Sequence, residues 1–215
     1  MLRKAWEQST RGKWWGQRAD IACFSFNGNK IITTGGGGML TTNNEAWAQR
    51  ARYLTTQAKD NPLEYIHNEV GYNYRMTNLL AAMGCAQLEQ LESYVEVKRR
   101  IASAYHTAFS NLPGIHPMPE ADWAFSTYWM YTILVDAIEY GMDSRALLAR
   151  LRDEGILSRP LWQPMHRSPA HRGSSSYGGE IADRLNRDAI SLPCSVGLTE
   201  EQQARVIAAV EDAAR

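Results

Sequence analysis

The chain has 215 residues, of which 44% are hydrophobic and 21% are charged, a composition that suits one globular domain or slightly more. Its 23 basic residues balance its 23 acidic residues, which argues against a nucleic-acid partner or an anionic membrane surface and favours a small-molecule ligand. The polar N-terminal segment and the lack of an apolar run of about 18 residues predict a cytoplasmic protein with no membrane segment. The cysteines have neither metal-ligand nor disulfide spacing, so we expect free thiols and no metal.

Two short apolar runs near the N-terminus predict strands. Residues 20–26 (DIACFSF) are bounded by polar turns and predict a buried strand, and residues 38–42 (GMLTT) predict a second one. The segment between them contains Lys30 and ends in a glycine run. Apolar residues then recur at helical spacing, which predicts a helix capped by Asn43 or Asn44. This order of elements is typical of the edge of an α/β sheet.

The middle of the chain combines an irregular segment with a long helix. Residues 60–76 are aromatic and rich in turn formers, and so long an irregular connection is uncommon in a compact domain unless it is functional. Thr77 is expected to begin a long helix, whose apolar residues keep helical spacing as far as Leu112. We place a domain boundary near its start, between an α/β fragment at 1–76, too small to close a core alone, and an α+β domain at 77–215.

The C-terminal part alternates strands and helices. Strands are expected at residues 127–135 and 156–162, and helices at residues 143–155, 180–190 and 199–214. Asp143 and Thr199 are the expected N-caps, Thr199 within a capping box that includes Gln202. Residues 167–179 are interpreted as a mobile loop.

Lys30 has two interpretations from its surroundings in the sequence. A lysine beside a glycine-rich turn is commonly a solvated surface charge. Lys30 also lies between an apolar strand and the β-branched run IITT, where desolvation favours the neutral amine that can attack an aldehyde carbon. Ser25 and Thr33 carry hydroxyls for a phosphate, and the glycines allow the backbone to approach a ligand closely. The residue order excludes a P-loop.

The segment SFNGNKIITTGGGGML, at 25–40, resembles the lysine motif of the DegT/DnrJ/StrS aminotransferases. These are pyridoxal-phosphate enzymes of fold type I that make amino sugars on nucleotide carriers. The commoner family form has histidine and threonine where this chain has Asn27 and Asn29. This variant is associated with the branch that acts on UDP-linked 4-keto sugars of the bacillosamine and legionaminic acid type.

Further segments agree with the family in the same order, and the resemblance covers nearly everything from Asp20 onward. Among them are GYNYRM at 71–76, RPLWQPMH at 159–166 and SLPCSVGLTEEQ at 191–202. The fold that the resemblance implies is α/β, the C-terminal portion of a fold type I transferase. It would comprise the edge of the large mixed sheet, with the lysine and an interface loop, and an α+β small domain.

The resemblance also implies residue roles. Lys30 would be the Schiff-base lysine of the cofactor pyridoxal 5′-phosphate. Ser25 would hold the cofactor phosphate, with Asn73 reaching it from the partner subunit of a homodimer. The residues that would face the nucleotide-sugar substrate are Arg75, Arg159, Trp162 and His166. For Arg75, Trp162 and His166 the structural alternatives are a helix-end charge, core packing and a satisfied loop histidine.

The implied reaction transfers an amino group from glutamate to a nucleotide-linked 4-keto-6-deoxy sugar, of which a UDP-2-acetamido sugar is the best candidate, with Lys30 as general base. The family's Asp-Ala-Ala segment, whose aspartate pairs with the pyridinium nitrogen, is not found before Lys30. We therefore expect a C-terminal portion with weak or absent activity by itself. The alternatives are an inactive fragment or interaction module, and a nucleotide-binding domain that uses the glycine run. Sugar dehydratases of the same type carry histidine in place of the lysine, so Lys30 disfavours them.

Overall fold

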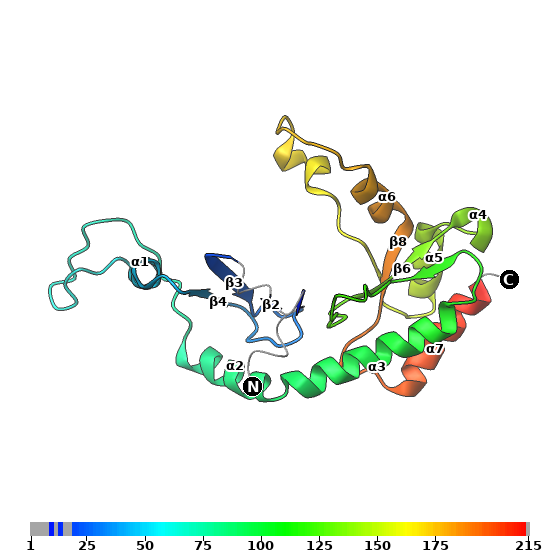
Figure 1. The fold of residues 1–215 in the computed structure, drawn as a ribbon, viewed down its shortest axis with the longest axis horizontal. Coiled ribbons are helices and arrows are strands. Elements are labelled where there is room, and N and C mark those ends of the chain that lie inside the picture. The colour runs from blue at the N-terminus through cyan, green and yellow to red at the C-terminus, as the bar shows by residue number, and fades with distance from the viewer. Residues whose placement is uncertain (1–8, 11–12, 15–18, 214–215) are drawn as a thin grey trace. The chain divides into compact units, whose positions relative to one another are not determined.

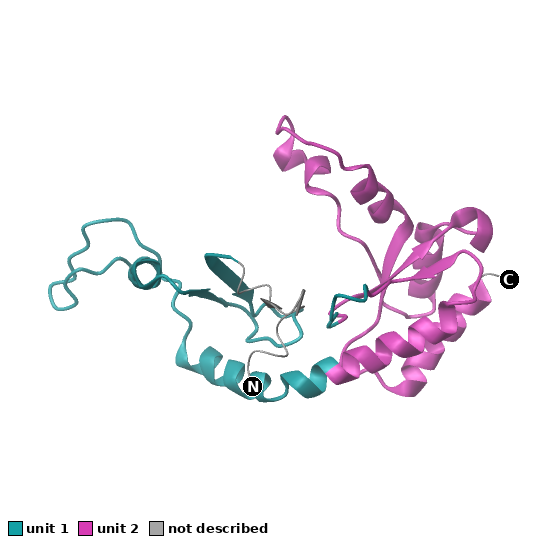
Figure 2. Cartoon of the chain, viewed as in Figure 1, with its two compact units in different colours: residues 1–95, 121–127 teal, residues 96–120, 128–215 magenta. Residues whose placement is uncertain are grey.

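The computed structural model of the protein forms two compact units (Figures 1 and 2). The structure describes residues 9–10, 13–14 and 19–213, so the polar N-terminal segment lies largely outside it. Unit 1 comprises residues 1–95 and 121–127, and unit 2 comprises residues 96–120 and 128–215. The contacts thus divide the chain inside a helix, and the assignment of residues 1–76 to a cofactor-binding domain stays a prediction.

Unit 1 contains a two-stranded antiparallel hairpin. Its strands β3 (Ile21–Ser25) and β4 (Gly38–Thr42) pair from Ile21↔Thr42 to Ser25↔Gly38, and β1 (Ser9–Thr10) pairs with β2 (Lys13–Trp14) in a separate ribbon. Both strands predicted beside Lys30 are confirmed. The predicted burial of the first is wrong, because alternate side chains of β3 are exposed and Ile21 keeps 41% of its surface accessible. Alternate side chains of a strand point to opposite faces, and a two-stranded ribbon cannot cover both.

The described part of unit 1 has two complete helices and part of a third, and the two complete helices begin where capping side chains predict. They are α1 (Glu45–Thr55), α2 (Asn78–Glu89) and the first turn of α3 (Leu91–Phe109). The Asn44 side chain accepts a hydrogen bond from Trp47 N at 3.2 Å, and Thr77 Oγ1 accepts one from Leu80 N at 3.4 Å. The single long helix expected from Thr77 is two helices. The chain tightens at Gln90, whose N–H bonds a carbonyl three residues earlier at 3.1 Å.

The connection predicted at 60–76 is confirmed as irregular, with no helix or strand of its own. An isolated antiparallel bridge joins Thr56 to Asn73 and closes its end against α1. Gly71 makes this approach possible, because a Cβ there would lie 2.3 Å from Ala58 N. Only glycine fits a backbone contact of that kind.

Unit 2 is an α+β fold on a four-stranded antiparallel sheet with the order β5-β6-β8-β7. The strands are β5 (Ile115–Pro117), β6 (Tyr131–Val135), β7 (Arg159–Pro160) and β8 (Ala189–Leu192). The helical elements after α3 are α4 (Ala137–Tyr140), α5 (Ser144–Asp153), η2 (Met165–Arg167), η3 (Pro169–His171), α6 (Glu180–Asp188) and α7 (Glu200–Ala213). In the described part of the chain, no helix is long and apolar enough to span a bilayer.

The core of unit 2 lies between the sheet and the buried faces of α3, α5 and α7. Tyr105 of α3 is fully buried and stacks on both Phe109 and Tyr131, with ring centroids 5.7 Å and 5.0 Å apart. Leu147 of α5 and Val210 of α7 are also fully buried in this cluster. Burial of large aromatic and aliphatic side chains is the main stabilising term for a fold of this size.

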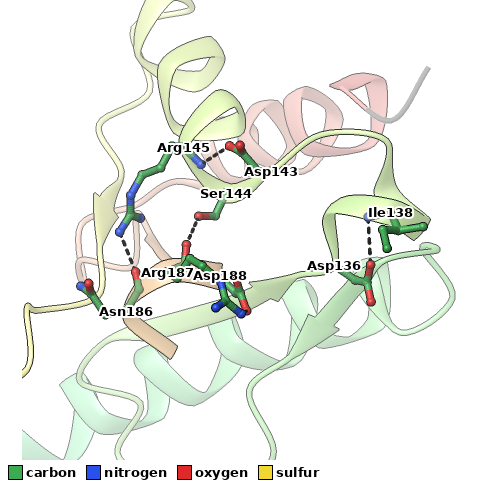
Figure 3. Close-up of polar contacts among 8 residues, drawn as sticks. All are labelled: Asp136, Ile138, Asp143, Ser144, Arg145, Asn186, Arg187 and Asp188. Carbon is green, nitrogen blue, oxygen red and sulfur yellow. Dashed lines mark hydrogen bonds and ion pairs between the residues drawn. The ribbon is translucent and has the colours of Figure 1, made fainter. Parts of the chain in front are cut away.

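Local polar contacts set where the helices of unit 2 begin (Figure 3). Asp143 caps α5 by accepting hydrogen bonds from Arg145 N at 2.9 Å and from Ala146 N at 2.8 Å. Ser144 and Arg145 then donate to backbone carbonyls at the end of α6, each at 2.6 Å. The capping box predicted for α7 is confirmed, because Thr199 and Gln202 bond each other's backbone N–H at 3.1 Å and 3.0 Å.

Several predictions for unit 2 differ from the structure, and the strand expected at 127–135 begins only at Tyr131. The strand expected at 156–162 is reduced to β7, and the loop expected at 167–179 begins with the turns η2 and η3. The helix expected at 180–190 ends at Asp188, because its last two residues belong to β8, whose residues are all buried. Pairing with β6 and β7 on either side determines this ending, and periodicity within the segment does not reveal it.

Candidate functional site

The connection between β3 and β4 brings Ser25 and Lys30 together. Lys30 N donates to Asn27 O at 3.0 Å, which closes a turn, and Asn27 N donates to Ser25 Oγ at 3.3 Å. Ser25 lies at the exposed end of β3, and because its oxygen accepts this bond its own proton can still be donated to a ligand. One short loop therefore holds an amine and a hydroxyl, the two groups predicted to bind the cofactor.

The far side of the same loop is fixed by its own hydrogen bonds. Thr33 Oγ1 donates to Phe26 O at 2.9 Å and accepts from Gly35 N at 2.8 Å, and Thr34 N donates to Phe26 O at 3.1 Å. Phe26 N in turn donates to Gly37 O at 3.0 Å. The Thr33 hydroxyl thus serves the loop itself in this structure, and its interpretation as a phosphate ligand stays a prediction.

A small apolar cluster packs the loop against α3. Ile32 retains only 3% of its surface and packs with Leu91 and Val95 of α3. Thr34 is buried as well, and α2 approaches it so closely that a Cβ at Gly84 would lie 3.0 Å from the threonine methyl. The position of the loop is thus set by α2 and α3, and a rigid support of this kind is what a reactive side chain requires.

Lys30 is partly buried, which is intermediate between a solvated surface charge and a desolvated amine, the two interpretations of its sequence. It is not a fully solvated charge, and the described residues do not enclose it completely. Added Cβ atoms at Gly28, Gly35 and Gly36 would meet no atom within 4 Å. The loop is therefore open on the side of these glycines, and a ligand can approach its backbone there.

Asn73 and Arg75 lie on the irregular segment that follows α1. Both are exposed, and the backbone of Asn73 forms the bridge to Thr56. Arg75 lines an open hollow of about 470 Å³ in unit 1, to which Arg52 of α1 and Gly38 of β4 also contribute. Gly38 pairs with Ser25 in the hairpin, whereas Ser25 and Lys30 themselves do not line this hollow.

Arg159 and Trp162 belong to unit 2, on and just after β7. Arg159 is exposed, and its guanidinium donates to the carbonyl of the preceding residue at 2.9 Å. The indole of Trp162 stacks on Trp129, with ring centroids 5.7 Å apart and planes inclined by 28°, and 62% of its surface remains accessible. Core packing, the structural alternative for Trp162, is therefore wrong, because most of this residue is exposed.

His166 is tied to α6. Its Nε2 lies 2.9 Å from Asp183 Oδ1, and Arg167 binds the same carboxylate with both ends of its guanidinium, at 3.0 Å and 2.7 Å. These partners, Arg167 first and His166 second, hold the pKa of Asp183 below its usual range. Gly179 is required beside them, because a Cβ there would lie 2.8 Å from the imidazole. In this chain the histidine therefore has the contacts of a satisfied loop residue.

Trp129 and Asp183 were not predicted from the sequence, although each contacts a predicted residue. Trp129 lies in the aromatic run TYWMY, which indicates only a strand, and Asp183 lies on the polar face of a helix. Their contacts join residues far apart in sequence. No signal in a single sequence identifies such partners.

The comparisons with known proteins agree on one family. The family model described as "DegT/DnrJ/EryC1/StrS aminotransferase family" matches residues 4–211. The chain is 41% identical to the putative pyridoxal phosphate-dependent aminotransferase EpsN of Bacillus subtilis over 92% of this chain and 51% of the relative. It is 39% identical to the GDP-perosamine synthase of Caulobacter vibrioides, over 94% of this chain and 54% of that protein.

A solved structure supports the same fold. The aminotransferase TlmJ of Streptoalloteichus hindustanus superimposes with a TM-score of 0.87 at 26% identity, covering 96% of this chain and 55% of that chain. The α/β fold expected for part of a fold type I transferase is thereby confirmed, and the chain spans about half the length of the curated relatives it matches. Pyridoxal phosphate, expected from the lysine motif, is confirmed as the cofactor of this family. The chain belongs to the DegT/DnrJ/EryC1/StrS aminotransferase family.

Proposed function

We propose that this chain carries the reactive lysine of a pyridoxal-phosphate-dependent sugar aminotransferase. The observation that carries the proposal is the β3–β4 loop, in which the backbone of Asn27 links the Ser25 hydroxyl to the Lys30 turn. Family membership supplies the chemistry that such an amine and hydroxyl serve. Both groups lie on one supported loop, as a site for an aldehyde and a phosphate requires.

The residues present fit the cofactor at two points. Lys30 offers a primary amine on a partly buried side chain, and Ser25 offers a hydroxyl proton for a phosphate oxygen. The open glycine side of the loop leaves room for a ligand beside both groups. Bound pyridoxal phosphate supplies an electron sink for the reacting carbon. Asn73 is proposed as a further phosphate ligand from the partner subunit of a homodimer.

Within this scheme the protein's own residues orient the reactants and move protons. Lys30 Nζ would attach the cofactor and, once displaced by the amino donor glutamate, would act as the base that removes and returns a proton. Arg159 and the exposed face of Trp162 are proposed contacts of the nucleotide sugar, since a guanidinium suits a diphosphate and an indole suits a flat ring. Arg75 is proposed for the same substrate. His166 is a weaker candidate because Asp183 already occupies its imidazole.

The proposed acceptor is a nucleotide-linked 4-keto-6-deoxy sugar, which becomes a 4-amino sugar. A UDP-2-acetamido sugar is supported by the Asn27 and Asn29 variant of the lysine motif. A GDP-linked sugar is the second candidate, and the 39% identity to a GDP-perosamine synthase favours it. Quenching of tryptophan fluorescence by UDP and by GDP, measured in the wild type and in Trp162→Phe, would distinguish the two carriers. A cytoplasmic location suits both nucleotides and stays a prediction.

Borohydride reduction in the presence of pyridoxal phosphate tests the lysine assignment. Reduction fixes the cofactor on the amine it occupies, and peptide mass spectrometry locates it. We expect the label on the Lys30 peptide, its loss in Lys30→Ala, and its retention in the matched control Lys59→Ala on the same unit. A label spread equally over surface lysines, or none at all, would contradict the proposal and favour a non-catalytic interaction module.

The shared-site proposal needs a separate measurement. Light scattering of the purified chain is expected to give twice the monomer mass, and Asn73→Ala is expected to weaken retention of the cofactor phosphate without changing that mass. A monomeric chain in which Asn73→Ala retains the cofactor as well as the wild type does would contradict the role of the partner subunit.

A further inference from the structure

Lys98 of α3 is a buried cation with neutral partners. It retains 6% of its surface, and its ammonium donates to Trp129 O at 2.7 Å and to Cys194 O at 2.6 Å. Cys194 Sγ lies 3.4 Å from the same nitrogen. Among residues 19–213, the ion pairs of the structure do not include Lys98. An ammonium has three protons to donate and accepts nothing, so these three contacts account for its donors.

The two carbonyls lie at one end of the central strand pair. The ladder between β6 and β8 ends at Tyr131↔Leu192, and Trp129 and Cys194 lie two residues beyond this pair, before β6 begins and after β8 ends. Lys98 therefore bonds the two backbone segments that extend β6 and β8, at the point where they no longer pair with each other. Tyr105, two helical turns later on α3, donates to Pro193 O at 2.8 Å and adds a second bond from the helix to the same end of β8. The end of the strand pair is thus fixed by side chains of α3.

The side chain of Trp129 contacts a residue on the surface of unit 2. Trp129 stacks on Trp162, and most of Trp162 is accessible. A bond to the carbonyl of Trp129 restrains its backbone, and the backbone in turn limits the rotamers available to the indole. Lys98 is in this way connected through a single residue to the exposed aromatic surface of unit 2.

The charge of Lys98 has a desolvation cost that its bonds to the two carbonyls offset only in part. A buried ammonium loses its hydration, and carbonyl partners replace it less well than a carboxylate does, so a hydrophobic side chain of similar length is often tolerated at such positions. What a hydrophobic residue does not provide is a pair of directed donors to two carbonyls. We propose that Lys98 is a positioning residue that sets the stacked Trp129–Trp162 pair. That this pair receives the nucleotide sugar rests on the proposed function, whereas the positioning itself does not.

The exciton couplet that two stacked indoles give in far-ultraviolet circular dichroism reports the geometry of the pair. The measurement uses the complete chain without cofactor or substrate, so its failure is distinct from a failure of the proposed function. Trp162→Phe defines how much of the signal comes from the pair. We expect Lys98→Met to lose more than half of that signal, Lys98→Arg to keep most of it, and Arg100→Met to keep all of it. Arg100 is an exposed cation on the same helix and controls for loss of charge.

Thermal unfolding followed at a helical wavelength shows whether each variant is folded. An unchanged couplet in a folded Lys98→Met protein would overturn the proposal. Should Lys98→Met not fold, Lys98→Gln decides, because it keeps an N–H donor but cannot reach both carbonyls: a reduced couplet supports positioning and a full one overturns it. Failure of both variants to fold would also overturn it, since Lys98 would then support unit 2 as a whole.

Discussion

Replacement of Tyr140 by phenylalanine isolates one buried hydrogen bond in the core of unit 2. Tyr140 ends α4, retains 2% of its surface and donates its phenolic proton to Val210 O of α7 at 2.5 Å. Phenylalanine fills the same volume without the hydroxyl, so the packing is preserved and the carbonyl loses its partner. A buried group left unsatisfied costs about 1–3 kcal/mol. We expect Tyr140→Phe to lower the free energy of unfolding by about this amount at neutral pH.

The same substitution has a pH dependence whose sign is fixed by the structure. Burial raises the pKa of Tyr140 from its ordinary value near 10 to about 12. Because the folded pKa lies above the unfolded one, the contribution of the neutral phenol is complete below pH 10 and is lost as pH rises toward 12. At about 1.4 kcal/mol per pKa unit, this loss approaches about 3 kcal/mol. The advantage of the wild type over Tyr140→Phe should therefore shrink, and near pH 12 it should vanish or reverse.

Urea unfolding followed by circular dichroism at several pH values between 7 and 11.5 tests this reasoning. Other buried tyrosines, such as Tyr105 and Tyr131, also have raised pKa values, but they are present in both proteins and cancel in the difference. A difference between the two proteins that stays constant from pH 8 to pH 11 would refute the argument. Equal stability at neutral pH would refute the hydrogen-bond part alone.

Two further changes test the loop and the small-domain surface. In Gly38→Ala the new Cβ would lie 2.6 Å from a backbone carbonyl of β3, so we expect a loss of about 1–3 kcal/mol and several-fold weaker cofactor labelling of the neighbouring lysine. Gly36→Ala, whose Cβ would meet nothing within 4 Å, is the matched control. Equal labelling of both variants would argue against strain of the hairpin by the Cβ of Gly38→Ala. Asp183→Asn removes the carboxylate that binds Arg167 and His166, so amide hydrogen exchange in η2 should quicken. Because the pKa of Asp183 is lowered, the exchange rate of η2 in the wild type should approach that in the variant only as pH falls through that pKa. Equal exchange rates at neutral pH would contradict this.

The elements that the sequence predicts well are those decided by neighbouring residues. Asn44, Thr77, Asp143 and Thr199 all cap the helices expected of them, because a cap is a bond between a side chain and a backbone N–H two or three residues away. The strand β4 is bounded in the same local way, by a glycine run before it and a polar turn after it. Patterns of this range are visible without the fold.

The elements that the sequence misses depend on distant partners. β8 joins directly to α6, and only its pairing with β6 and β7 separates it from the helix. The candidate site shows the same division, since Ser25 and Lys30, both predicted from the sequence, are linked through Asn27 within six residues. Trp129 and Asp183 were not identified, because what makes them informative is a contact with a residue far along the chain.

The turn of the lysine loop does not depend on the side chains at positions 27 and 29. The two bonds that connect Ser25, Asn27 and Lys30 use the backbone N–H and C=O of Asn27, so they do not depend on which side chain occupies that position. The side chain of Asn29 is linked to that of Asn27, because Asn27 Nδ2 donates to Asn29 Oδ1 at 3.3 Å. Asparagine at both positions supplies the matching donor and acceptor. The two asparagines are therefore linked to each other on the exposed side of the loop, while the backbone of Asn27 holds the turn that carries the lysine.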